Sequence, residues 1–356
     1  MKEIGTKVLK TVRDQVQSSP ATKSGPRTGK DLFAAIRPFA VESVTRSWWL
    51  VGSTFLMLTV SLVGAALAPA WPLRLVCSIV AALLMVRAFI TYHDYMHNAI
   101  LSQSRLARLL FRAYAALALT PPRSWKASHN YHHGHVGKVA GPSIGAFPIM
   151  TTDMWRKASR VTHAGYRIER HPLTILAGYF TIFFLSITLL PLLKNPVRHW
   201  DSFLVLLGHG SLIALLWVFG GFDTAFFVVL LPMTIASMIG SYLFFAQHSF
   251  DGMRILPEES WTYQRAALES SSYMKLNRVM RWITGNIGYH HIHHLNVRIP
   301  FYRLPEAMEA IPELQSPVTT TLSFHDIRAC FRCCLWDPAS PRMVTYSEAA
   351  VGDVSS

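Results

Sequence analysis

The chain has 356 residues, 51% hydrophobic and only 15% charged, with a mean hydropathy of +0.26. Soluble domains carry about 25% charged residues, so the composition excludes an ordinary water-soluble domain and predicts a membrane protein. The net charge of +14 is expected mainly in cytoplasmic segments that face anionic lipid, or as an attraction for an acidic soluble partner. We expect no nucleic-acid partner. The four cysteines do not have the pattern of a disulfide framework, and no cleavable signal peptide is apparent.

The first part of the chain predicts a basic arm followed by a helical hairpin. Residues 1–44 are interpreted as a cytoplasmic N-terminal arm, because the first 37 residues hold eight Lys or Arg against three acids. Two apolar runs follow, at about 48–70 and 73–92, each long enough to cross a hydrocarbon core of roughly 30 Å. The hairpin returns the chain to the side on which it began.

Arginines that recur every three or four residues mark 105–120 as a helix that lies in the membrane interface. Three more apolar runs follow, at 173–193, 202–219 and 222–247. If all three crossed, histidine clusters on either side of them would face opposite sides of the membrane and could not share a site. Because Lys194 and Arg198 mark the loop after the first run as cytoplasmic, we expect that run to be re-entrant or interfacial and the other two to cross.

These elements predict an all-α multi-pass membrane protein with two transmembrane hairpins, four spans, and a cytoplasmic histidine-rich cap that holds a di-metal site. The membrane domain is expected over 45–310, and 311–356 is interpreted as a cytoplasmic C-terminal tail. Both termini and the active site are then cytoplasmic, in a bacterial inner membrane.

Three histidine clusters carry the candidate chemistry. In YHDYMHN, His93 and His97 are four residues apart, so a helix places both rings on one face. Asp94 is a candidate for orienting a ligand ring through a hydrogen bond. The glutamate of a zinc-protease HExxH motif is absent, because the motif here reads HDxxH.

The second and third clusters share the spacing H-x2-H-H. The residues are His129, His132 and His133 in HNYHHGH, and His290, His293 and His294 in NIGYHHIHHL. His135 and His291 fall outside this spacing and are not predicted to be ligands. Asn286 is a weaker candidate for a supporting or water-anchoring group. For the third cluster alone, histidines that simply face water remain an alternative.

His248 lies in FFAQHSF, where the last predicted span reaches the cytoplasmic side. A single histidine at a helix end often only complements the helix dipole, but the topology places this one beside the clusters. Eight or nine imidazoles are enough for two metal ions with about four ligands each. Imidazole binds Fe, Zn, Cu and Ni alike, so the ligand type does not choose the metal.

HDYMH, HNYHH and HHIHH, separated by two hydrophobic hairpins, resemble the histidine boxes of the membrane fatty acid desaturase family. The resemblance covers roughly 45–310, and the first box and QHSF are more similar to acyl-lipid than to acyl-CoA desaturases. It implies two Fe ions bound by the eight box histidines, with His248 as an additional ligand. It further implies O2 as co-substrate, a cis double bond formed in a fatty acyl chain, and two electrons from an external donor of the ferredoxin or cytochrome b5 type.

Two other functions remain open. The same scaffold supports lipid hydroxylases and ketolases, because an oxidant that abstracts hydrogen from carbon can also add oxygen. A histidine-rich metal transporter is a distant alternative, because it would need ligands near the middle of the membrane, whereas these clusters lie at span ends or in polar segments.

Overall fold

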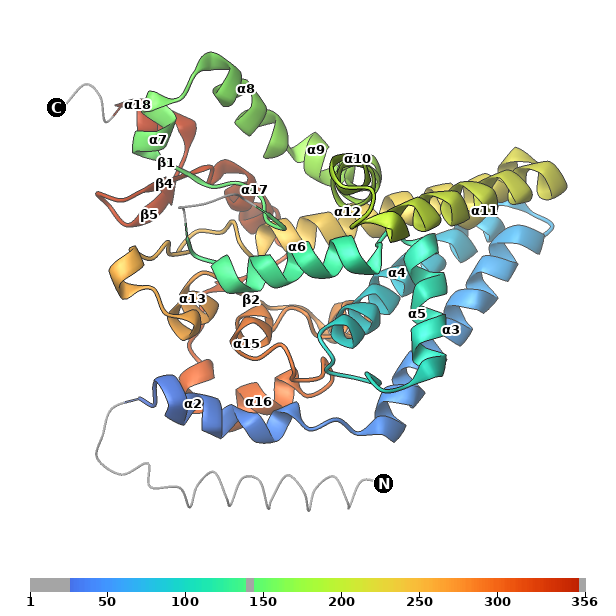
Figure 1. The fold of residues 1–356 in the computed structure, drawn as a ribbon, viewed down its shortest axis with the longest axis horizontal. Coiled ribbons are helices and arrows are strands. Elements are labelled where there is room, and N and C mark those ends of the chain that lie inside the picture. The colour runs from blue at the N-terminus through green and yellow to red at the C-terminus, as the bar shows by residue number, and fades with distance from the viewer. Residues whose placement is uncertain (1–25, 139–143, 352–356) are drawn as a thin grey trace.

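The computed structural model describes residues 26–138 and 144–351 of the chain. Long apolar helices gather on one side of the molecule and shorter elements on the other, with the helix that carries the second histidine cluster between them (Figure 1). The helices of the first half are α2 (Gly29–Ile36), η1 (Arg37–Ala40), α3 (Val44–Leu67), α4 (Trp71–Met96), α5 (Arg105–Leu117), α6 (Pro122–His135), α7 (Thr152–Lys157), α8 (Arg160–Glu169), α9 (Pro172–Leu176), η2 (Tyr179–Leu189) and α10 (Leu190–Lys194). The helices of the second half are α11 (Trp200–Ala225), η3 (Phe226–Leu230), α12 (Leu231–Ala246), η4 (Glu258–Ser260), α13 (Tyr263–Glu269), α14 (Arg278–Ile283), α15 (His290–Leu295), α16 (Leu304–Ala310), η5 (Pro312–Leu314), α17 (Phe324–Arg332) and α18 (Tyr346–Val351).

Helices α3 and α4 form the first hairpin and pack along each other (Figure 1). Both are long and apolar enough to cross a membrane, with 24 and 26 residues. The predicted spans 48–70 and 73–92 fall on these helices, but each helix begins earlier, and α4 ends later, than predicted. The extension of α4 to Met96 has a consequence for the site, because it keeps the first histidine cluster on helical backbone.

The predicted runs 202–219 and 222–247 fall, except for the last residue of the second, in a third candidate membrane helix, Trp200–Ala246, which is 47 residues long. A straight helix of that length would measure roughly 70 Å, more than twice a hydrocarbon core. It is interrupted at Gly221, whose φ of 77° and ψ of 168° are not helical. Beside this break, Thr224 accepts a hydrogen bond of 2.9 Å from Arg74 at the start of α4. The break therefore lies at the same end of the molecule as the turn between α3 and α4.

The run 173–193 is not among the helices long enough to cross a membrane in the described part of the chain. It is divided into α9, the π-helical η2 and α10, with Pro191 near the start of the last piece. Of this run, only the shorter stretch Tyr179–Lys194 forms a continuous apolar helix. That 173–193 is re-entrant or interfacial stays a prediction.

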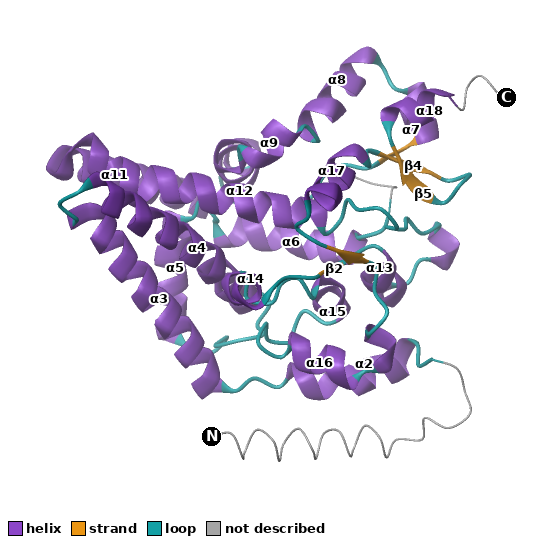
Figure 2. Ribbon diagram, turned by 180° about the vertical axis from the view of Figure 1, so that it is seen from behind, coloured by secondary structure: helices purple, strands orange, loops and turns teal. Residues whose placement is uncertain are grey.

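The prediction of an all-α chain missed two small sheets. In one, β1 (Met150–Thr151) pairs with β4 (Leu335–Asp337), which pairs with β5 (Arg342–Val344); in the other, β2 (Tyr273–Met274) pairs in parallel with β3 (Thr319–Thr320). Strands of two or three residues are too short to show an alternating pattern in the sequence. Through β3 and β4 the described part of the segment expected as a tail pairs with the main body. In Figure 2, α17, β4, β5 and α18 of this segment lie at the upper right.

The predicted N-terminal arm is also packed in the part that the structure describes. Leu32, Ile36 and Phe39 are buried in a cluster with residues of α15 and α16. Arg27 forms an ion pair of 2.7 Å with Glu313. The apolar spacing of Leu32, Ile36 and Phe39 is typical of a helix that buries one face, and the sequence analysis did not use it. The first 25 residues lie outside the described part, and the cytoplasmic location of the arm stays a prediction.

Candidate metal centre

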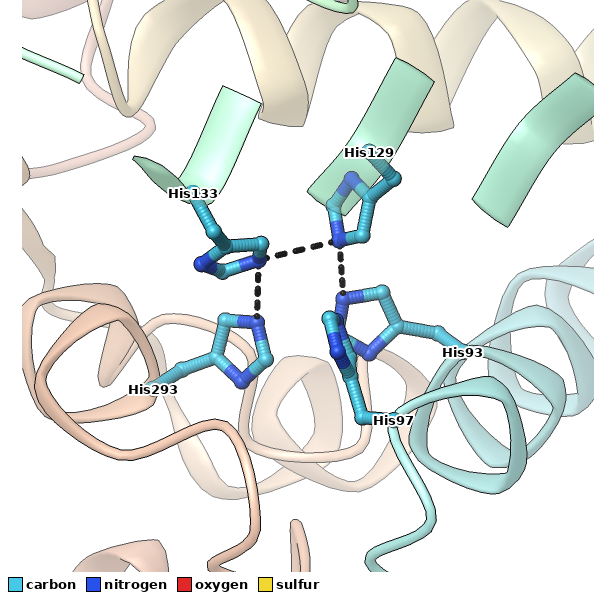
Figure 3. A group of neighbouring side chains, drawn as sticks. All are labelled: His93, His97, His129, His133 and His293. Atoms are coloured by element: carbon cyan, nitrogen blue, oxygen red, sulfur yellow. Dashed lines mark hydrogen bonds between the residues drawn. The ribbon is translucent and has the colours of Figure 1, made fainter. Parts of the chain in front are cut away.

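Nine buried histidines converge in two groups at the ends of the long helices. They come from the C-terminal end of α4, from α6 and α15, and from the second residue after α12. His93, His97, His129, His133 and His293 form one group, and His132, His248, His290 and His294 form the other; within each group the ligand nitrogens lie within 4.8 Å of one another. These are the nine residues predicted as metal ligands, and Figure 3 shows the rings of the first group pointing toward a common centre.

The two H-x2-H-H clusters divide their histidines between the groups in the same way. On α6, His129 and His133 are one helical turn apart and join the first group, while His132 joins the second. On α15, the pair one turn apart, His290 and His294, joins the second group, while His293 joins the first. Each helix therefore contributes two nitrogens to one group and one nitrogen to the other.

The Nε2 atoms converge in a number that hydrogen bonds between neutral imidazoles cannot all satisfy. The Nε2 of His129 lies 3.0 Å from that of His93 and 3.1 Å from that of His133. The Nε2 of His248 lies 3.0 Å from that of His132 and 2.9 Å from that of His290. A neutral imidazole has one N–H and one lone pair, so converging Nε2 atoms in this number fit lone pairs that share a cation.

Contacts on the far side of the rings favour the same orientation. The Nδ1 of His248 lies 3.0 Å from the Ser270 carbonyl oxygen, to which it donates. The Nδ1 of His93 lies 3.2 Å from a carboxylate oxygen of Asp94. In both rings a proton on Nδ1 leaves the lone pair on Nε2, which is how metal-binding histidines are oriented in proteins.

Burial keeps the rings neutral. It lowers the pKa of His129, His132 and His133 well below the usual value of 6.5, and the positive charges of neighbouring rings would lower it further. Burial also lowers the pKa of His248 to about 4. Rings that do not protonate near pH 7 offer lone pairs to a metal ion.

Asp94 also connects the histidine site to the loop before α16 through a hydrogen bond. Its second carboxylate oxygen accepts a hydrogen bond of 2.6 Å from the backbone N–H of Phe301. The carbonyl of Phe301 accepts in turn from the Asn286 side chain at 3.1 Å. Asn286 therefore supports the peptide that holds Asp94. Its side-chain hydrogen bond goes to this peptide and not to a histidine ring of either group. Phe301 was not anticipated from the sequence, because it acts through backbone atoms.

Two histidines of the same motifs lie outside both groups. His291 is fully buried and its Nε2 lies 3.2 Å from the Leu314 carbonyl oxygen. His135 stacks on Tyr131 with ring centroids 3.8 Å apart. Both had been left out of the predicted ligand set.

An apolar cavity of about 710 Å³ reaches both groups. His93 and His129 of the first group and His290 of the second form part of its wall. Its other walls include Met85 of α4 and Met233 of α12. Cavities of this size and character bind small apolar ligands, so the histidine groups lie where such a ligand can reach them.

The nitrogen atoms of the two groups determine which metal ions the site can bind. All nine donors are imidazole nitrogens, which suit iron, zinc, copper and nickel. Each group has enough nitrogens for one metal ion, so the site fits two ions side by side.

Comparisons with known proteins agree with this arrangement. The family model described as "Fatty acid desaturase" matches residues 69–322. The chain is 30% identical to a fatty acid desaturase of Bacillus subtilis (strain 168) over 77% of this chain and 78% of that protein. It is 22% identical to an sn-1 oleoyl-lipid 12-desaturase of Synechocystis over 67% and 68% of the two chains, and 22% identical to an sn-1 acyl-lipid omega-3 desaturase (ferredoxin) of Nostoc over 83% of each.

The matched residues 69–322 contain all nine histidines of the two groups. With its apolar helices and its two histidine groups beside an apolar cavity, the chain belongs to the fatty acid desaturase family, whose members are oxidoreductases.

Proposed function

We propose that the chain is an O2-dependent acyl-lipid desaturase that forms a cis double bond in a fatty acyl chain. Two neighbouring –CH2– groups lose one hydrogen each and become –CH=CH–. These two hydrogens, O2, two external electrons and two protons form two waters. The observation that carries the proposal is the pair of buried histidine groups that share one apolar cavity. The relatives whose names specify acyl-lipid substrates support the choice of lipid class.

The site residues have defined roles in this proposal. The nine histidines hold two Fe ions, which when bound supply the redox chemistry that an unactivated C–H bond requires and that zinc does not provide. Asp94 and the Ser270 carbonyl fix the orientation of His93 and His248. The apolar walls of the cavity hold the acyl chain beside His93, His129 and His290 and keep water away from it.

The electrons come from a separate carrier. The ferredoxin in the name of the Nostoc relative supports a carrier of that type, with a cytochrome b5-type protein as the other option. The net charge of +14 favours an acidic carrier. The rate of reduction should then fall as ionic strength rises, and a rate insensitive to salt would exclude docking by charge.

The proposal also specifies a placement in the membrane. The α3–α4 hairpin and the two halves of Trp200–Ala246 on either side of Gly221 make four crossings. The histidine groups then face the cytoplasm of a bacterial inner membrane. The contact between Arg74 and Thr224 supports this arrangement, because it keeps the turns of both hairpins together at the opposite end.

Expression in a host with a compatible reductase, followed by mass spectrometry of the fatty acids, tests the function. A new double bond in membrane lipid supports the desaturase, and a product with an added oxygen would identify a hydroxylase instead. His132→Ala and His293→Ala remove one nitrogen from each group and should abolish the product and lower the iron content. If both variants keep full iron, the ligand assignment is wrong.

A further inference from the structure

A second, smaller cavity of about 240 Å³ lies between α3, α4 and α14. It shares no lining residue with the apolar cavity beside the histidines. Val86 lines the apolar cavity and the next residue, Arg87, lines the small one, so the two cavities flank α4. No histidine of the two groups lines the small cavity, although Asn286 and Phe301, which support Asp94, are part of its wall.

Four arginines line this cavity: Arg46, Arg87, Arg278 and Arg281. No acidic residue is among its walls in the described part of the chain. The remaining lining is apolar or neutral and includes Trp282 and Tyr302. A cavity with this lining has a strong excess of positive charge.

Arg87 is the least expected of the four. It belongs to a candidate membrane helix and is only 3% exposed. Its guanidinium donates to Thr54 Oγ1 at 3.1 Å and to the Trp282 carbonyl, and it stacks over the Trp282 ring at 4.3 Å. No carboxylate within the described residues pairs with Arg87. Charged residues inside membrane helices generally pair with an opposite charge or serve a binding site, and here the charge faces the cavity.

The other arginines also keep positive charge available. Arg46 forms an ion pair of 3.1 Å with Glu306, and Glu306 does not line the cavity. Arg281 donates to the neutral hydroxyl of Tyr289. Arg278 is exposed and, among the described residues, makes no side-chain hydrogen bond or ion pair. Three of the four guanidiniums therefore have no acidic partner within residues 26–138 and 144–351.

The surroundings of the cavity fit the boundary between lipid headgroups and acyl chains. Arg46 is in the first turn of α3, a candidate membrane helix, and Trp49 one turn later is 73% exposed. On α14, Val279 is 66% and Trp282 44% exposed, although both are apolar. Exposed tryptophan beside arginine is typical of this boundary.

We propose that this cavity binds the phosphate of an anionic membrane phospholipid. Arginine is suited to the role, because its planar guanidinium donates two parallel hydrogen bonds to phosphate oxygens. Arg278 and Arg281 reach the phosphate from the headgroup side, and Arg87 closes the inner end. Val279, Trp282 and Trp49 contact the upper part of the acyl chains. The bound lipid is a structural or regulatory ligand and not the acyl chain held in the apolar cavity.

Native mass spectrometry of the purified full-length protein in neutral detergent tests the proposal. Phosphatidylglycerol and phosphatidylcholine with the same acyl chains are titrated separately. We expect one phosphatidylglycerol to be retained at concentrations at which phosphatidylcholine is not. Each basic residue near a lipid headgroup contributes a factor of about five in affinity, so Arg278→Gln should weaken retention about fivefold and the double variant with Arg281→Gln about 25-fold.

The matched control is Arg328→Gln on α17, which removes one exposed arginine outside the cavity. Its phosphatidylglycerol retention should equal that of the unaltered chain. Within the part of the chain that the structure describes, Arg278 makes no side-chain bond that folding would lose, so the single variant separates lipid binding from misfolding. Equal retention of both lipids, or equal effects of Arg278→Gln and Arg328→Gln, would overturn the proposal. A third titration with inorganic phosphate distinguishes the sources: displacement of phosphatidylglycerol at equal concentration would identify a free-phosphate site and exclude the lipid.

Discussion

His248 lies outside the three histidine motifs, so its replacement is the sharpest test of the two-group arrangement. The second group consists of four histidines, and His248→Ala reduces it to three while the first group keeps five. Even residues that only support a ligand contribute a factor of about 10–100 to metal affinity. Loss of a direct ligand should therefore weaken the second site at least about 100-fold, which is about 2.7 kcal/mol.

His291→Ala is the matched control for this substitution. Both histidines are buried, burial lowers the pKa of each to about 4, and each bonds to one backbone carbonyl. Either replacement leaves a carbonyl without its donor, at a cost of about 1–3 kcal/mol in the free energy of unfolding. The two metal-free variants should therefore be destabilised to a similar extent, and only His248→Ala should lose metal.

The assay is iron per chain after purification and dialysis against a weak chelator, measured by plasma mass spectrometry. The unaltered chain and His291→Ala should each keep about two irons, and His248→Ala about one. The unfolding of metal-free protein in denaturant checks that the two variants are equally folded. Full iron in His248→Ala, or an equal loss from His291→Ala, would refute the assignment of His248 as a ligand.

Three further substitutions follow from the structure. Asp94→Asn weakens the orientation of the neighbouring ring, so iron should be lost to a chelator about 10–100-fold more readily; an unchanged loss would remove Asp94 from the site. Gly240 lines the apolar cavity, so Gly240→Leu should shorten the preferred acyl chain or reduce turnover in fatty acid profiles, whereas Gly210→Leu, at an exposed position of α11, should change neither. The bond from Arg27 lowers the pKa of Glu313 from 4.5 to about 2. This ion pair therefore stabilises the fold above pH 4.5 and is lost as pH falls from 4.5 toward 2; Glu313→Gln should flatten that part of an acid-unfolding curve, and an unaltered curve would contradict the linkage.

Spacing in the sequence was sufficient to predict that the eight histidines of the three motifs gather, whereas His248 was predicted from the expected topology. Residues four apart on a helix share a face, which is why His129 and His133 lie in one group. Spacing could not predict that His132 and His293 would each join the group opposite to their neighbours. That division depends on how α6 and α15 face each other, which is a property of packing and not of either helix alone.

Other features depended on contacts between distant residues. Phe301 contacts Asp94 through its backbone N–H, which any residue except proline possesses, so no residue type marks it. Arg87 did have a signal, a cation within an apolar run, but its neighbours come from α3 and α14 and only the fold brings them together. The strands β2 and β3 pair residues 46 positions apart, Tyr273 with Thr319, and the local sequence does not predict such a pairing.

Helices α6 and α15 each place histidines in both groups, so the two metal sites form together. A metal ion in the first group fixes both helices, through His129 and His133 on one and His293 on the other. The nitrogens of the second group are then already in place. The protein therefore loses less conformational entropy when the second ion binds than when the first ion binds. Loading should consequently be cooperative, with few chains that hold one ion at intermediate iron concentrations. A shift of α15 by one residue would remove ligands from both groups at once, so the helix register itself is part of the metal site.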